Sequence, residues 1–208
     1  MASRLEGLQR TLAWSDFPTV RRTPPTPGGH FHGALTYTSY RLSTCSFRPE
    51  HGTRQFALLD NVVVTIEFTR TRSWVADLVA TRPPPFSADL LNHEQGHYAI
   101  TALCARDFFV DLMSLKPTRF DTPQAGLHAM ADIKRRTLDR IPSIQAMYDR
   151  EVHPEQNGGV SRGPIQLAWD GYIRSAFTIP RSPPSNAPDG VTHKIRLVDV
   201  LTRAGRLP

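Results

Sequence analysis

The chain has 208 residues, of which 39% are hydrophobic and 21% are charged, and this composition excludes wholesale disorder. The length fits one domain, so residues 1–208 are treated as a single unit. No apolar run approaches the roughly 18 residues of a membrane-spanning helix, and we expect no membrane span. Residues 1–14 are amphipathic and lack the apolar stretch of a signal peptide, which fits a cytosolic protein or a chain whose leader has been removed.

The net charge of +6 comes almost entirely from arginine, because lysine occurs only at positions 116, 134 and 194. A basic chain raises the question of nucleic-acid binding. The arginines are scattered, however, with short pairs only at Arg21-Arg22 and Arg135-Arg136. Since no basic stripe is interleaved with aromatic residues, we interpret the charge as a solvated surface and expect no nucleic acid among the partners.

The first part of the chain, about residues 1–82, is rich in strand-forming residues. Residues 34–42 alternate between two faces, which predicts a strand. Residues 56–68 contain two β-rich runs separated by Asp60-Asn61, which predicts a hairpin or two successive strands. Residues 73–75 extend this sheet or pack beside it. We therefore expect an N-terminal antiparallel β-sheet.

The triple proline at 83–85 ends the β-rich part, and a helix is predicted from about residue 88 to 109. Its polar positions (92, 95, 96, 106 and 107) fill one narrow sector, so this helix is expected to be buried on most sides. Further helices are predicted at 123–141, 142–152 and 164–177. Strands followed by helices indicate an α+β domain, with a helical part at about 86–178 and a linker and C-terminal tail at 180–208.

Residues 93–97 read His-Glu-Gln-Gly-His. Residues four apart lie on one face of a helix, so both imidazoles can reach a single ion. Glu94 is rotated too far to bind that ion directly and is placed to hold a water bound to it. Two imidazoles and a carboxylate on an apolar helix face would otherwise need several buried partners. The spacing therefore predicts Zn²⁺ bound by His93 and His97, with Glu94 as the general base.

A catalytic zinc needs a third protein ligand and an open fourth position. The segment 148–153 ends a predicted helix and concentrates ligand types, which favours His153, with Glu151 or Asp149 as alternatives. The weaker candidates are Asp111, which points away from the preceding turn, His128, which is typical of an ordinary helix position, and the loop pair His30 and His32.

The chain resembles a family of bacterial secreted zinc-dependent proteases that are grouped as a domain of unknown function. The string Leu-Leu-Asn-His-Glu-Gln-Gly-His at 90–97 is the specific part of this resemblance. Weaker matches appear in the same order as in the family: Trp14-Ser-Asp-Phe17, the threonine-rich strand at 34–40, Ser73-Trp74, Tyr148-Asp149 with Glu151 and His153, and Gln166 with Trp169. The resemblance implies a zincin-like fold, a peptidase activity, a secreted or periplasmic location, and His153 as the third ligand.

These observations favour a zinc-dependent hydrolase, in particular a metallopeptidase that acts on a peptide or protein substrate. Tyr148 is the candidate donor to the oxyanion that forms during peptide hydrolysis. The first alternative is a non-catalytic, zinc-stabilised binding module in which a fourth protein ligand closes the site. The second is a basic nucleic-acid-binding domain with an incidental motif, which steep salt dependence of binding would reveal.

Overall fold

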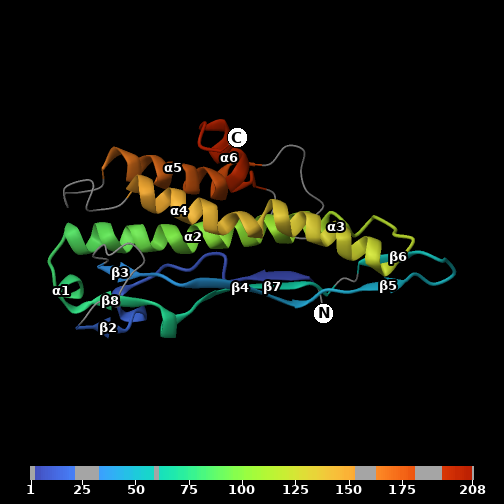
Figure 1. Cartoon of the computed structure of the whole chain (residues 1–208), viewed down its shortest axis with the longest axis horizontal. Helices are drawn as coiled ribbons and strands as arrows, with labels where there is room; N and C mark the ends of the chain where they lie inside the picture. The colour runs from blue at the N-terminus through green and yellow to red at the C-terminus, as the bar shows by residue number, and fades with distance from the viewer. Residues whose placement is uncertain (1–2, 22–32, 59–60, 153–162, 181–193, 208) are drawn as a thin grey trace.

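A computed structural model describes residues 3–21, 33–58, 61–152, 163–180 and 194–207. The fold is α+β, and a long helix, α2 (Phe86–Met113), occupies its centre. Small β-sheets cover one side of α2, and α4 (Ile141–Val152), α5 (Pro164–Thr178) and α6 (Leu197–Arg203) cover the opposite side (Figure 1). The predicted α+β class is therefore confirmed.

In the described residues, three small sheets form the β layer. In the first, β7 (Val63–Phe68) lies between β1 (Arg4–Glu6), which is parallel to it, and β4 (Thr38–Thr44), which is antiparallel. The second and third sheets consist of short strands: β2 (Thr19–Val20), β8 (Trp74–Ala76) and β3 (Ala34–Leu35) in one, and β5 (Phe47–Pro49) with β6 (Phe56–Leu58) in the other.

The prediction of an N-terminal antiparallel sheet is therefore wrong in part. The main sheet is mixed, and the described strands divide among three sheets. Residues 56–68 form two successive strands and not a hairpin, since β6 pairs with β5 whereas β7 pairs with β1 and β4. The expected strand at 34–42 is likewise split into β3 and β4. Alternation along a chain identifies a strand, but strand partners are chosen by contacts between distant segments.

The predicted helices are present. They are α3 (Pro123–Arg136), α4 (Ile141–Val152) and α5 (Pro164–Thr178), together with the short α1 (Asp77–Ala80) and α6 (Leu197–Arg203). Proline occupies the first turn of both α3 and α5, where its missing N–H costs nothing. The Thr122 side chain caps α3 by accepting a hydrogen bond from the N–H of Ala125. Among the described helices, none is long and apolar enough to cross a membrane.

The central helix is buried on both sides because it belongs to two hydrophobic clusters. Tyr98, Ala102 and Phe109 pack in the cluster that includes the sheet residues, whereas Ile100 and Leu103 pack in a second cluster with α4, α5 and α6. A helix with this position cannot keep a solvated polar face along its whole length.

Arg106 and Asp107 show the consequence, since both were assigned to the polar sector and both are almost fully buried. Arg106 forms an ion pair of 2.6 Å with Asp107 and donates hydrogen bonds to the backbone carbonyls of Ala176 and Ile195. The Asp107 carboxylate also accepts the N–H of Leu197. The pair therefore attaches the end of α5 and the start of α6 to the central helix.

Replacement of Arg106 by leucine is expected to lower the free energy of unfolding by about 3–5 kcal/mol, because it leaves the Asp107 carboxylate buried without its cation. Arg135→Leu is the matched control, since the Arg135–Asp132 pair is exposed and such pairs contribute about 1 kcal/mol or less. Urea unfolding measures both changes. Equal losses in the two variants would show that the Arg106 pair does not hold the C-terminal segment in this way.

Candidate metal centre

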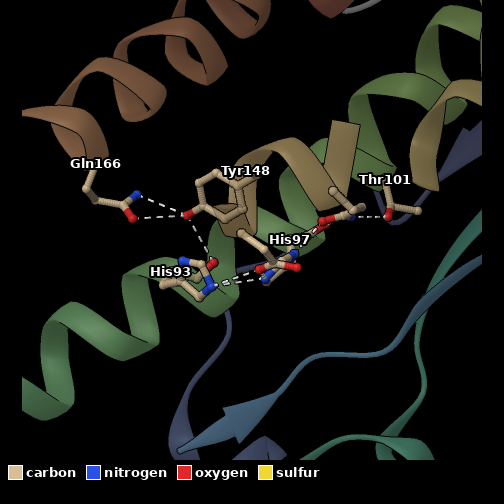
Figure 2. A network of polar contacts seen from close by, with 7 residues as sticks. His93, His97, Thr101, Tyr148 and Gln166 are labelled. Carbon is tan, nitrogen blue, oxygen red and sulfur yellow. Dashed lines mark hydrogen bonds and ion pairs between the residues drawn. The ribbon is translucent and has the colours of Figure 1, made fainter. Parts of the chain in front are cut away.

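The His93 and His97 side chains lie on the face of α2 that is covered by α4 (Figure 2). The four-residue spacing places the two rings side by side, with their centroids 4.7 Å apart. Both rings are largely withdrawn from solvent, with side-chain exposures of 7% and 14%. The predicted orientation of the histidine pair toward one point is therefore present in the structure.

Helix α4 supplies the next group of side chains. Tyr148 and Asp149 lie three and four residues after Gln145, so the three side chains share one face of α4. Gln145 contacts His97 and Thr101, whereas Tyr148 and Asp149 contact His93 and His97. Because higher numbers on α4 meet lower numbers on α2, the two helices run antiparallel along this contact.

Three donor atoms converge between these helices. The Nε2 atoms of His93 and His97 are 3.1 Å apart, and Asp149 Oδ1 lies 3.4 Å from the first and 2.9 Å from the second. Atoms bound at about 2.0–2.2 Å to a tetrahedral ion are separated by roughly 3.3–3.6 Å, so one of the three distances matches this spacing and the other two are shorter by a few tenths of an ångström. Together, His93, His97 and Asp149 have the spacing of a metal-binding triad.

The electrostatics of the triad also favour a cation. Burial lowers the pKa of His97, but the hydrogen bond and charge of Asp149, together with the charge of Glu94, outweigh it and raise this pKa to about 9. Burial raises the pKa of Asp149, but the hydrogen bonds from His93 and His97 bring it well below its usual range. The raised pKa of His97 and the lowered pKa of Asp149 both mean that this cluster favours positive charge at the point where the donor atoms meet.

Glu94 follows the first histidine and is only 3% exposed. Its Oε2 atom is buried and has no hydrogen-bond partner in the described parts of the chain, and the same is true of His93 Nδ1. A buried carboxylate oxygen without a partner is costly unless something else binds there. Because the charge of Glu94 also acts on His97, the carboxylate lies close enough to influence the triad.

Tyr148 is fully buried between the triad and α5. Its ring stacks on His93 at 4.7 Å, and its hydroxyl donates to the backbone carbonyl of His93 at 3.2 Å and is bonded to the amide of Gln166 (Figure 2). These contacts engage the hydroxyl with protein groups and favour a positioning role. The predicted oxyanion role of Tyr148 is not tested by them and stays a prediction.

Gly96 makes the approach of Tyr148 possible. A Cβ atom at this position would lie 2.2 Å from the Tyr148 hydroxyl and 2.6 Å from its ring carbon, far inside contact distance. The sequence motif therefore contains a fourth required residue, Gly96, besides the two histidines and the glutamate. Sequence reasoning had placed Gly96 only in the polar sector, and it had not identified Gln145 at all.

The other predicted ligands are placed elsewhere or are not described. His153, His30 and His32 lie outside the described residues, so His153 as a ligand stays a prediction. The structure places three other candidates away from the triad. His128 is exposed and bonded to Gln124, and Asp111 pairs with Arg196. Glu151 accepts a hydrogen bond from the Trp169 indole and pairs with Arg206.

A family model described as "Bacterial protein of unknown function (DUF922)" matches residues 18–158. This span contains the strands β2 to β8, the motif helix α2 and all of α4. Neither a curated protein nor a solved structure matches the chain.

Gly96→Ala is expected to lower both the melting temperature and the metal affinity, because the added methyl group pushes α4, and with it Asp149, away from α2. The direction is opposite to intrinsic helix propensity, which favours alanine over glycine by about 1 kcal/mol. Gly171→Ala on α5 is the matched control, since a Cβ there meets nothing within 4 Å. That variant should be as stable as the parent or more so by thermal unfolding; a Gly96→Ala protein that behaves like it would refute the close-contact argument.

Proposed function

The chain belongs to this bacterial family of unknown function, and from its own geometry we propose that it is a zinc-dependent hydrolase that cleaves peptide bonds. The observation that carries the proposal is the convergence of His93 Nε2, His97 Nε2 and Asp149 Oδ1 at mutual distances of 2.9–3.4 Å. Glu94 follows directly after the first of these residues, as the chemistry of such a site requires.

Two imidazoles and one carboxylate form a donor set that suits zinc in a catalytic site. Three protein ligands leave one tetrahedral position for water or for a substrate oxygen. The side chain of Asp149 is 46% exposed, in contrast to the two histidines, so the site opens to solvent on the α4 side. This opening supports a site that exchanges substrate and product.

Zinc, when bound, would supply Lewis acidity that polarises a substrate carbonyl and acidifies a coordinated water. Glu94 would hold that water, take its proton during attack on the carbonyl carbon, and give the proton to the departing amine. Its buried Oε2 atom, without a partner in the described chain, is free to accept this proton. His93, His97 and Asp149 would hold the ion, and the carboxylate of Asp149 would also offset part of its charge.

The proposed peptide substrate is supported by the sequence motif and by the family resemblance at that motif. We propose a zincin-like fold on the same grounds. The alternative function is a zinc-stabilised binding module, and it depends on His153, which follows α4 directly in the sequence. If His153 binds zinc together with the triad, four protein ligands fill the tetrahedron and exclude water. The chain would then be a zinc-stabilised binding module and not an enzyme.

The zinc affinities of two variants should distinguish these two functions. We expect close to one zinc per chain after exhaustive dialysis, and Asp149→Ala should weaken the zinc affinity by several orders of magnitude, since only two protein ligands remain. His153→Ala should leave the affinity within about tenfold if the site is open. A competition titration against a chromogenic chelator measures each value.

The zinc affinities of these two variants and the zinc content of the parent distinguish three further possibilities. Large losses in both Asp149→Ala and His153→Ala would indicate four protein ligands and the binding module. A large loss in His153→Ala alone would make His153 the third ligand and Asp149 a neighbour of the site. A folded parent protein with less than about a tenth of one zinc per chain would remove the metal proposal itself.

Glu94→Gln is expected to keep the zinc and lose the reaction. The amide has the size of the carboxylate but cannot accept a proton, so hydrolysis of denatured casein should fall by at least about a hundredfold. Glu67→Gln is the control, because Glu67 is an exposed residue on β7 that pairs with Arg41. Equal cleavage by Glu94→Gln and the parent would exclude Glu94 as the base.

A further inference from the structure

Gln145 lies on α4 one turn before Asp149, and both ends of its side-chain amide are hydrogen-bonded. Its Nε2 group donates to the backbone carbonyl of His97 at 2.8 Å and to the Thr101 hydroxyl at 3.1 Å. Its Oε1 atom contacts Nδ1 of His97. Figure 2 shows this part of the network between His97 and Thr101. A single amide thus contacts both the backbone and the ring of a candidate metal ligand.

The direction of these bonds follows from the carbonyl of His97. A backbone carbonyl only accepts hydrogen bonds, so the amide atom that faces it must be the N–H₂ group. The reverse orientation would place two acceptor oxygens 2.8 Å apart. With the N–H₂ group fixed toward the carbonyl, the atom facing the His97 ring is the oxygen, which can only accept. Nδ1 of His97 must therefore carry a hydrogen.

From this geometry we propose that Gln145 is a positioning residue that holds His97 with its hydrogen on Nδ1 and its Nε2 lone pair toward the metal. The proposal rests on the proposed function, since it concerns the same triad. A neutral imidazole has one N–H and one lone pair, so fixing the hydrogen on one nitrogen fixes the lone pair on the other. Such partners also orient the ring and raise the basicity of the ligand.

The position of Gln145 is itself fixed by the sheet layer. The Thr101 hydroxyl accepts from Gln145 and donates to the Thr38 hydroxyl on β4 at 3.3 Å. The chain of bonds therefore runs from β4 through α2 to the side chain on α4. Thr101 is only 2% exposed, so water competes little for this hydroxyl.

The two histidines are held in different ways, which makes the role of Gln145 specific to one of them. His93 stacks on Tyr148 with an angle of 12° between the rings, and its buried Nδ1 has no partner in the described chain. His97 meets Tyr148 edge to face at 83° and has the Gln145 oxygen on Nδ1. Apart from the contacts within the triad, the His93 ring is thus held by packing and the His97 ring by a directed hydrogen bond.

Two substitutions at this position separate the accepting oxygen from the two donated bonds. Gln145→Met has nearly the same length and removes both functions, so zinc affinity should weaken by about 10- to 100-fold. Gln145→Glu loses the donated bonds and places a carboxylate oxygen opposite the His97 carbonyl, so the variant should be less stable than the parent. It keeps an oxygen for Nδ1–H, and its zinc affinity should therefore stay within about threefold of the parent value. A merely structural clamp between the helices depends on the donated bonds and would be lost equally in both variants.

Gln124→Leu is the matched control, because Gln124 also contacts a histidine, His128, but on the exposed surface of α3. Its zinc affinity should equal that of the parent. Nitrogen-detected NMR of the metal-free protein gives a second measurement that needs no zinc. The His97 Nδ1–H signal should be protected from exchange in the parent and in Gln145→Glu, and lost in Gln145→Met.

Unchanged zinc affinity in Gln145→Met, or equal weakening in both variants, would overturn the positioning role. If Gln145→Met does not fold, absence of a protected Nδ1–H signal in the parent or in Gln145→Glu would overturn it as well. Failure of the parent to bind zinc would instead sink the proposed function, and the NMR result would still report on Gln145. The two proposals can therefore fail separately.

Discussion

The contact of the Tyr148 ring with the bare backbone at Gly96 controls how closely α4 approaches α2. Tyr148 fills the space that any side chain at position 96 would occupy, and its ring then rests on His93. This spacing brings the next residue of α4, Asp149, to the two imidazoles, and it brings Gln145, about one turn earlier, to His97. The geometry of the candidate centre thus follows from one helix–helix contact that only glycine permits.

The buried polar groups toward the two ends of α2 are arranged in different ways. Toward the C-terminal end, Arg106 and Asp107 form an ion pair, and their other hydrogen bonds go to the backbone of α5, α6 and the residues before α6. Toward the N-terminal end, nitrogen and oxygen donors face one another, and Glu94 Oε2 is buried without a partner in the described chain. Polar groups that stabilise a fold are paired, so the first arrangement is structural, whereas the second calls for an additional ligand.

Rigidity at the centre comes from its neighbours on three layers. β4 reaches the triad through Thr38 and Thr101, α4 contributes Gln145 and Tyr148, and α5 supports Tyr148 through Gln166. A metal or catalytic site needs its ligands held within a fraction of an ångström, and ligands on helices are held better than ligands on loops. Asp149 is the most exposed member of the triad, so the site combines two fixed histidines with one side chain near solvent.

The sequence by itself determined helices α2 to α5, the positions of most strands and the orientation of the two histidines. These features are local, because the spacing of His93 and His97 within one helix fixes their common face whatever surrounds it. The α+β class followed from the order of the elements in the same way. The sequence also pointed to the segment around residues 148–153, since ligand types are concentrated there.

Only the tertiary structure decided which residues of that segment meet the histidines. Gln145 lies 48 residues from His97 in the chain and Tyr148 lies 55 residues from His93, so no local pattern could choose Asp149 for the triad or reveal Gln145. The same reason explains why Arg106 and Asp107 were expected on a polar face, and why the strands were assigned to one sheet. Side-chain periodicity describes an element alone, whereas burial and pairing depend on what the rest of the chain packs against it.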